Sequence, residues 1–463
     1  MSLTGQSAQN SCDAPNSSPY IHFAAAPAAR RERPQVSADA LRFLRILGAS
    51  ASMVLAVGAP LAAQDDPALA HARALLKSVP LIDGHNDLPW EIRTSETAPR
   101  DVQAYNLNAA APGNTDIARL RAGEVGAQFW SIYIPGEARD SGYARMQLEE
   151  FDIARRMIAM YPNTLEFVTT ADGIEKAFKS GHIGSLLGME GGHAIENSLG
   201  ALRSYYDLGA RYMTLTHNVT LDWADAAQDT LKHGGLTPFG QEVVREMNRL
   251  GMLVDLSHVS PGVMSNVLDI SESPVIFSHS SAWALTNHKR NVPDSILRRL
   301  PKNGGVVMVT FVPGFTSTRF GAWEAARDSV VRTHTAAGAD SAAVRAQVKA
   351  WVNANPRPAS TLSDVADHVE YVRKVAGVDH VGLGSDFDGM GPVTPAGLED
   401  VSKYPELFAE LIRRGWNDGD LKKLAGLNML RVIRANEATA KRLQATRQPS
   451  TKTIQQMDHP AGS

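Results

Sequence analysis

Apolar and polar positions follow a repeating order along this chain, in which a short apolar run is followed by a polar residue and then a turn. Eight runs have the length and apolar character of buried strands. The runs are Val79–Asp83, Gly126–Ile134, Ile183–Met189, Arg211–Thr216, Met252–Ser257, Pro274–Ser278, Gly305–Phe311 and His380–Ser385. The order therefore predicts eight strands, most of which end at a polar side chain.

Segments with apolar residues at helical spacing separate most of these runs. They are Asp66–Lys77, Tyr143–Met160, Leu199–Leu208, Pro238–Leu250, Pro261–Ile270 and Ser363–Val375. Eight strands alternating with helices predict an α/β fold of the (β/α)8 TIM-barrel type. A doubly wound open sheet shows the same alternation and is the alternative. Polar residues after most strands favour the closed barrel, because an open sheet collects its site at one switch point.

Three segments lie outside this alternation. We expect the barrel domain to span residues 64–445, with a long insertion at 315–358 that is rich in Ala and Arg. The insertion is predicted to be helical, and its place on the loop side suggests a lid or a subunit contact. Residues 446–463 are polar and aperiodic, which predicts a mobile tail. Residues 1–63 are an N-terminal extension that does not belong to the barrel.

The N-terminal extension has the pattern of an export signal. Arg42 and Arg45 precede an uncharged stretch, residues 46–63, which ends in small residues before a polar start. We expect cleavage near Gln64 and a periplasmic or secreted protein; an uncleaved membrane anchor is the alternative. The only cysteine, Cys12, lies upstream of the stretch. A cleaved chain would therefore lack disulfides and cysteine-ligated zinc.

Composition adds little to this picture. The chain has 463 residues, of which 43% are hydrophobic and 21% charged, as in an ordinary soluble enzyme. The net charge of −3 gives no reason to expect a nucleic acid or an anionic membrane surface as a partner.

Candidate chemistry comes from histidine and acidic residues that follow six of the predicted strands. They are His85 and Asp87, Glu190, His217, His258, His279 and Asp386. The carboxyl ends of barrel strands share one rim, so we expect these side chains to meet there. Histidine and carboxylate ligands without sulfur suit zinc, with manganese or iron as alternatives. The set predicts a two-metal hydrolytic site.

Five of these residues are candidate metal ligands. His85 and Asp87, two apart at a strand end, point the same way and can hold one ion; the alternative is a helix N-cap beside a surface histidine. Glu190 has two oxygens that can bridge two ions, or it is an ordinary loop glutamate. His258 and His279 end neighbouring strands about 5 Å apart and can share the second ion. Their alternative is a pair of core histidines bonded to the backbone.

The remaining candidates face the substrate. His217 can be a further ligand. Because the five other residues already provide ligands for two ions, it is better suited to stabilise a developing oxyanion. Arg290 can hold a substrate carboxylate in a bidentate pair, or it is a solvated loop arginine. Asp386 can accept a proton and pass it to a leaving amine. Asp388 competes for that role, although strand alternation favours Asp386. We expect His193 to lie behind the ligands.

These residues stand in motifs that resemble the renal or membrane dipeptidase family of zinc peptidases, within the amidohydrolase-like barrels. The motifs are His85-Asn86-Asp87-Leu88-Pro89-Trp90, Glu190-Gly191-Gly192-His193, Leu215-Thr216-His217-Asn218, Trp223-Ala224-Asp225, Asp255-Leu256-Ser257-His258-Val259-Ser260, Phe277-Ser278-His279-Ser280-Ser281-Ala282, Arg290-Asn291-Val292-Pro293-Asp294 and Gly384-Ser385-Asp386-Phe387-Asp388-Gly389. They cover roughly residues 75–440 and are specific as a set.

The resemblance implies a catalytic assignment for the whole site. It places His85 and Asp87 on one zinc and His258 and His279 on the other, with Glu190 and a water or hydroxide bridging the two. It places His217 and Arg290 on the substrate and makes Asp386 the acid and base. The resemblance thus implies a TIM barrel of the metal-dependent hydrolase type that hydrolyses dipeptides through the bridging hydroxide.

Two other functions remain open on the sequence. One is another amidohydrolase-type hydrolysis on the same barrel, of an N-acyl-D-amino acid, a lactone or a cyclic amide, which would need no carboxylate clamp at Arg290. The other is a binding protein that has kept the barrel and lost the metals. For a dipeptidase we expect small dipeptide substrates and a homodimer, without a nucleic-acid partner or a stable membrane partner.

Overall fold

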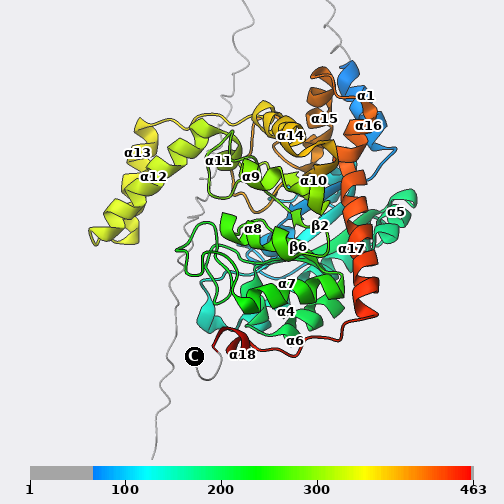
Figure 1. Cartoon of the computed structure of the whole chain (residues 1–463). Helices are drawn as coiled ribbons and strands as arrows, with labels where there is room; N and C mark the ends of the chain where they lie inside the picture. Colours follow the sequence, from blue (N-terminus) through cyan, green and yellow to red (C-terminus); the bar gives the residue numbers. More distant parts are fainter. Residues whose placement is uncertain (1–65, 460–463) are drawn as a thin grey trace, which may run out of the picture. The chain divides into compact units, whose positions relative to one another are not determined.

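A parallel sheet that closes on itself forms the centre of this computed structural model, which describes residues 66–459 (Figure 1). Its strands are β1 (Leu81–Asn86), β2 (Val125–Tyr133), β4 (Ile183–Glu190), β5 (Ala210–Thr214), β6 (Leu253–Asp255), β7 (Ile276–Phe277), β8 (Val306–Val309) and β9 (Val381–Leu383). Each strand pairs in parallel with its neighbours, and the β2–β4 and β1–β9 pairings complete the ring. The predicted (β/α)8 barrel is confirmed, and the open-sheet alternative is wrong.

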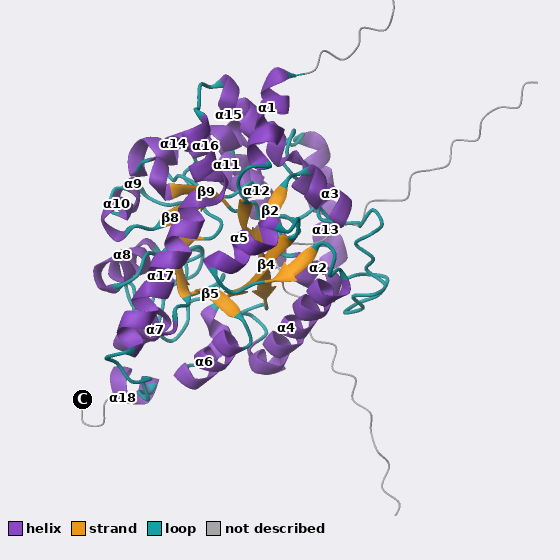
Figure 2. Ribbon diagram, turned by 90° about the vertical axis from the view of Figure 1, so that its right-hand side faces the viewer, coloured by secondary structure: helices purple, strands orange, loops and turns teal. Residues whose placement is uncertain are grey.

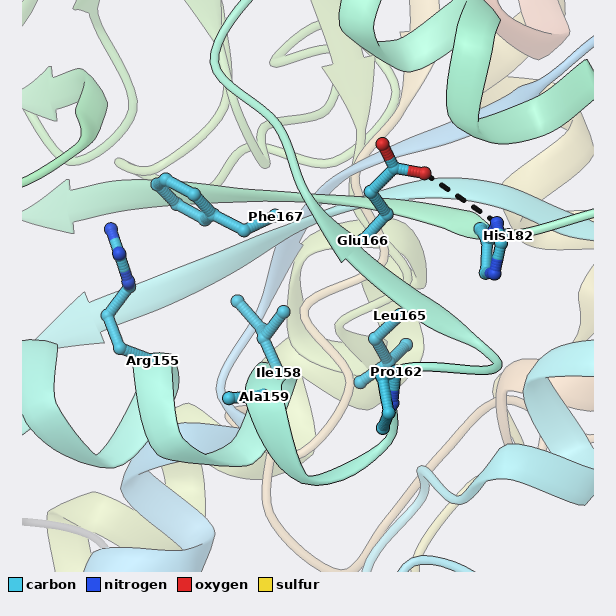
Figure 3. A pocket seen from close by; sticks show the side chains of 8 residues that line it. All are labelled: Arg155, Ile158, Ala159, Pro162, Leu165, Glu166, Phe167 and His182. Carbon is cyan, nitrogen blue, oxygen red and sulfur yellow. Dashed lines mark ion pairs between the residues drawn. The ribbon is translucent and has the colours of Figure 1, made fainter. Parts of the chain in front are cut away.

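One further strand, β3 (Leu165–Phe167), was not predicted. It pairs with the first three residues of β4, before β5 begins to pair with β4 at Leu187. A cavity of about 350 Å³ lies beside it (Figure 3). There the guanidinium of Arg155 lies 4.0 Å from the ring centroid of Phe167, and Glu166 pairs with His182 at 3.6 Å. This cavity adjoins the start of β4, away from Glu190 at the other end of that strand.

Helices surround the strands (Figure 2). The six helices predicted from sequence are all present, as α1 (Pro67–Leu76), α4 (Tyr143–Met160), α6 (Leu199–Asp207), α7 (Pro238–Leu250), α8 (Pro261–Ile270) and α14 (Leu362–Ala376). The others that cover the barrel include α5 (Ala171–Lys179), α15 (Tyr404–Arg413) and α17 (Asn428–Gln444). Side-chain caps set the helix starts: Thr237 accepts from Gly240 N before α7, and Ser260 accepts from Val263 N before α8. Both helices then begin with proline, whose missing N–H would be unpaired there in any case.

The amino end of the barrel is filled by apolar side chains. Ile82, Ala127, Leu253, Ile276 and Val306, which lie at or near the starts of their strands, form one buried cluster. Residues of α17 belong to the same cluster, among them Met429, Leu430 and Ile433. The helix therefore closes this end of the barrel, and the carboxyl end is left for polar side chains.

The insertion between β8 and β9 is helical, as the sequence predicts. It contains α11 (Pro313–Thr316), α12 (Thr318–Ala336) and α13 (Ser341–Ala354), and α12 and α13 project from the barrel as a hairpin (Figure 1). Val344 and Val348 are buried within it, and the rings of Trp323 and Trp351 lie 5.6 Å apart. Its proposed role as a lid or a subunit contact stays a prediction.

The described part of residues 446–463 contains secondary structure that the sequence did not predict, and the mobility of this tail stays a prediction. A short helix, α18 (Ile454–Asp458), packs against α7, and Ile454 is buried. The Asp458 carboxylate accepts hydrogen bonds from Thr237 Oγ1 (2.6 Å) and Phe239 N (2.9 Å), which satisfies donors at the start of α7. The predicted export signal lies outside the described residues. Within residues 66–459, no helix combines the length and the apolar character that a membrane crossing needs.

Candidate metal centre

Seven histidine and acidic side chains from six strand ends meet at the carboxyl end of the barrel. They form three overlapping groups whose nitrogen and oxygen atoms lie within 4.8 Å of one another. The groups are His85 with Glu190 and His279, Glu190 with His217 and His258, and His85 with Asp87 and Asp386. The structure thus brings together all seven residues that the strand-exit pattern singled out, and Arg290 reaches the centre from a loop.

His85 and Asp87 approach the centre from β1. Asp87 occupies the N-cap position of α2 (Leu88–Arg93), but its side chain makes no cap hydrogen bond. Its Oδ2 instead lies 3.2 Å from His85 Nε2, and the two other carboxylates nearest that nitrogen are Glu190 at 3.5 Å and Asp386 at 4.0 Å. The same side chain that could have capped the helix therefore turns towards the candidate ion site.

Glu190, the last residue of β4, lies between two sets of histidines. Its Oε2 faces His85, while its Oε1 lies 2.9 Å from His258 Nε2 and 3.4 Å from His279 Nε2. His217 Nε2 is 3.9 Å from the same Oε1. The two Nε2 atoms of His258 and His279 are 3.0 Å apart, so these rings face each other and not the backbone. Oε2 of this carboxylate thus lies nearest to His85, and Oε1 lies nearest to His258, His279 and His217, while the rings of His85 and His279 are themselves 3.9 Å apart.

The electrostatics of this cluster fit bound cations. Burial lowers the pKa of His217, His258 and His279 well below the usual value, so these rings are neutral near pH 7 and offer lone pairs. Burial also raises the pKa of Glu190 and Asp386, an effect that His85 opposes and the negative charge of Asp87 reinforces. Carboxylates gathered in this way gain their charged forms when a cation lies among them.

Arg290 is buried, which excludes the solvated alternative. Its Nη2 lies 2.7 Å from His279 Nε2, and its guanidinium carbon lies 5.3 Å from the centroid of the Phe315 ring. The ring of His217 lies 4.3 Å from that of His258 and 4.7 Å from that of Tyr133. Arg290 thus contacts the cluster at His279 and His217 contacts it at His258.

Asp386 and Asp388 have different surroundings. Asp386 joins the ligand cluster, whereas Asp388 Oδ1 accepts a hydrogen bond from Asn114 N at 2.5 Å and so holds the loop that contains Asn114. His258 and Asp386 both have left-handed backbones, with φ of +66° and +70°. Such angles are uncommon for residues with a Cβ and concentrate at functional sites. His193 is bonded to Ile134 O at 2.9 Å, behind the cluster.

Two contacts that orient the ligand rings were not anticipated. Tyr212 Oη lies 2.8 Å from His85 Nδ1, and Ser278 Oγ lies 2.9 Å from His279 Nδ1. The tyrosine ring fits because it packs over Gly188, its pairing partner on β4, where a Cβ would lie 2.0 Å from the ring. A glycine opposite an inward tyrosine is a usable signal once the strand register is known. The serine gives none, because a serine before a histidine is unremarkable.

Comparison with known proteins decides the family. A family model described as membrane dipeptidase, peptidase family M19, matches residues 69–447. The chain belongs to this family. Dipeptidase 3 of Mus musculus and of Rattus norvegicus are both 42% identical to it over 378 residues, which make up 80% of this chain and 68% of each relative. M19 dipeptidases are metal-dependent peptidases, which agrees with the clustered ligands.

Solved structures show that the M19 fold is shared. The probable dipeptidase PvdM from Pseudomonas aeruginosa superposes with a TM-score of 0.70 at 23% identity, covering 81% of this chain and 99% of that one. A metallo peptidase from Rhodobacter sphaeroides superposes with a TM-score of 0.63 at 22% identity, covering 77% and 99%. At these identities the likeness supports the barrel and not a substrate.

Proposed function

We propose that this M19 dipeptidase is a di-zinc enzyme that hydrolyses the peptide bond of free dipeptides. The observation that carries the proposal is the divided carboxylate of Glu190, whose Oε2 faces His85 and whose Oε1 faces His258 and His279. A bridging carboxylate between two nitrogen-ligand sets is the donor arrangement of a two-metal hydrolase. His85 and Asp87 would hold one ion, His258 and His279 the other. When bound, the two ions would polarise the scissile carbonyl and activate water.

The protein groups around the ions supply the remaining steps. Asp386, whose pKa is raised by burial, is suited to take a proton and return it to the departing amine. His217, neutral and half-buried beside Glu190, is suited to stabilise the negative charge that develops on the carbonyl oxygen. Neither step requires a side chain from outside the cluster.

Arg290 limits the length of the substrate in this proposal. A buried guanidinium at the edge of the cluster can bind the C-terminal carboxylate in a bidentate pair. With that carboxylate fixed, only about one residue fits between it and the scissile bond. The Rhodobacter sphaeroides relative was solved with a phosphinate mimic of the dipeptide L-Ala-D-Ala. That ligand belongs to the neighbour, and dipeptides are proposed as the substrate class of this chain because it belongs to the membrane dipeptidase family.

The experiment compares free and C-terminally amidated dipeptides on two variants. Arg290→Ala should raise KM for free dipeptides and change the reaction of amidated ones far less, because these never used the charge. Lys289→Ala is the matched control, since it removes an exposed positive charge next in sequence. Equal losses on free and amidated substrates in Arg290→Ala would contradict the clamp and favour a broader amidohydrolase activity.

Metal content tests the other half of the proposal. Purified enzyme should hold about two zinc ions per chain, and Glu190→Gln should lose more than one, because the bridge is gone. Retention of both ions with full activity in that variant would contradict the assignment of Glu190 as the bridge between them.

Export and assembly belong to the same proposal. We expect the mature protein to be periplasmic or secreted and to begin near Gln64, which N-terminal sequencing measures directly. An intact N-terminus in membrane-extracted protein would favour the anchor. We also expect a homodimer, with the α12–α13 hairpin as the candidate contact. Sedimentation should therefore give a dimer for the full chain and a monomer for a variant without residues 318–354.

A further inference from the structure

Two aspartates that take no part in binding the proposed ions lie directly beneath the candidate metal centre. Asp83 on β1 and Asp255 on β6 are fully buried. Asp83 lies two residues before His85, and Asp255 lies three residues before His258. Each contacts a serine that lies just after the end of the neighbouring strand, β9 or β7. That serine comes immediately before another centre residue: Ser385 before Asp386, and Ser278 before His279. The barrel therefore repeats one arrangement at two places.

The arrangement on β6 is fully hydrogen-bonded. Asp255 Oδ1 accepts from the backbone N–H groups of Ser257 (3.1 Å) and Ser278 (2.8 Å). Asp255 Oδ2 accepts from Ser278 Oγ at 2.6 Å and from Thr214 Oγ1 at 2.5 Å. The carboxylate thus ties β6 to β5 on one side and to β7 on the other.

The arrangement on β1 is closely similar. Asp83 Oδ1 accepts from Ser385 N at 2.7 Å, and Asp83 Oδ2 accepts from Ser385 Oγ and from Tyr404 Oη, both at 2.7 Å. Gln128 Nε2 at 3.1 Å and His85 N at 3.4 Å also donate to this carboxylate. This carboxylate ties β1 to β9, the pairing that completes the barrel.

The two serines differ in their other contacts. Ser278 Oγ lies 2.9 Å from His279 Nδ1 and 3.5 Å from Ser257 Oγ. Ser385 Oγ accepts from Phe387 N at 3.3 Å and lies 3.4 Å from the backbone oxygen of His85, so it contacts no imidazole nitrogen. A serine hydroxyl has one hydrogen, and the short bond to Asp255 uses it. Ser278 Oγ must then accept the hydrogen of His279 Nδ1. This leaves the lone pair on Nε2, the atom that lies 2.7 Å from the donor Arg290 Nη2 and 3.4 Å from Glu190 Oε1.

We propose that Asp255 and Ser278 are positioning residues that fix the tautomer and orientation of His279 and so control retention of the metal at His258 and His279. The inference rests on the proposed function, because it needs a metal on that side of Glu190. The other side lacks this chain of contacts, since His85 Nδ1 meets a tyrosine hydroxyl instead. We call the contacts from Asp255 through Ser278 to His279 the relay. Losing the relay should therefore affect only the ion at His258 and His279.

The test uses Ser278→Ala, with Ser385→Ala as its matched control. Each variant removes one serine bond to a buried aspartate, but only Ser278→Ala removes the partner of an imidazole. Zinc-loaded full-length protein is titrated with a chelator, and the metal left per chain is measured together with the melting temperature. Ser278→Ala should release one of its two ions at about 10–100-fold lower chelator strength than wild type. Ser385→Ala should release both as wild type does, with a comparable fall in melting temperature.

The outcomes separate this inference from the proposed function. Wild-type protein that holds fewer than two ions would overturn the proposed function itself. Two ions in wild type, with equal retention in Ser278→Ala or equal losses in both variants, would overturn the relay alone. Asp255→Ala is the second variant should Ser278→Ala fail to fold. It takes away both oxygens that accept from Ser278, so it should also release one ion early, and unchanged release there would overturn the relay.

Discussion

The two ends of the same eight strands differ in what their side chains do. At the amino end, apolar residues such as Leu186 and Ile276 pack with α17 in a cluster that excludes water. At the carboxyl end, four histidines and three carboxylates face one another. Burial there shifts the pKa of Glu190 and Asp386 upwards, which means that folding works against their charges.

The difference shows where this barrel gains stability and where it gives stability up. Apolar burial at the amino end contributes on the order of 25 cal/mol per Å². The carboxyl end instead holds left-handed residues, buried like charges and a buried guanidinium, each of which costs free energy without a ligand. Substitutions at the amino end should therefore lower stability and leave activity unchanged. Substitutions at the carboxyl end should lower activity and raise the stability of the metal-free protein.

The largest effect is expected for Asp386→Asn. The change keeps the size of the side chain and removes its proton-accepting charge, so kcat should fall by about 10²–10⁴-fold while the metals stay bound. In metal-free protein the melting temperature should rise, because one buried carboxylate is gone. Stopped assays, metal analysis and calorimetry measure the three quantities.

Asp388→Asn is the control for that prediction. Its amide oxygen can still accept from Asn114 N, and it leaves the ligand cluster untouched. A similar fall in kcat in both variants would show that this loop matters as a whole and that Asp386 has no special role.

A smaller effect, confined to stability, is expected for Leu186→Ala at the opposite end. Leu186 is fully buried on β4, and truncation leaves a cavity that costs about 2–5 kcal/mol of unfolding free energy. Glu190 lies four residues further along the strand, about 13 Å away, so kcat of the folded enzyme should not change. Leu208→Ala, at a leucine that is 41% exposed, is the control. Denaturant titration would reject the comparison if both variants lost the same stability.

The smallest effect is expected for the slope of the unfolding free energy against pH. His368 on α14 is buried, its Nδ1 accepts from Ala282 N at 3.0 Å, and burial lowers the pKa of the ring to about 4. Unfolded histidine titrates near 6.5, so between pH 6.5 and 4 the unfolded state holds the extra proton. Stability is therefore fully present above pH 6.5 and falls as the pH drops towards 4, by up to about 1.4 kcal/mol per pH unit for one proton.

His368→Asn keeps an acceptor near Ala282 and removes the titration. Its unfolding free energy should fall less steeply than that of wild type across this window. Urea titrations of both proteins at several pH values give the two slopes directly. Parallel curves would show that His368 does not contribute.

Sequence predicted most of the barrel and of the clustered side chains, for one physical reason. Parallel strands bring their carboxyl ends to one rim, so residues such as His85 and His258, far apart in the chain, are placed by strand position alone. Tyr212 needed the register that pairs it with Gly188, which no local pattern contains. The strand β3 reads Leu165-Glu166-Phe167 and lacks the longer apolar run that marked the other strands. The helix α18 was not predicted, because it is held by a hydrogen bond between Asp458 and Thr237, two residues that lie more than two hundred positions apart.

The α12–α13 hairpin has a consequence for how such an enzyme can diverge. It packs largely on itself, through Val344, Val348 and the Trp323–Trp351 contact, and it is inserted between two strands that pair directly. The entropic cost of a longer connection grows only with the logarithm of its length. Selection can therefore lengthen, shorten or exchange this segment while β8 and β9 keep their register. Descendants of this chain can therefore acquire different segments between β8 and β9 while the clustered histidines and carboxylates stay in place.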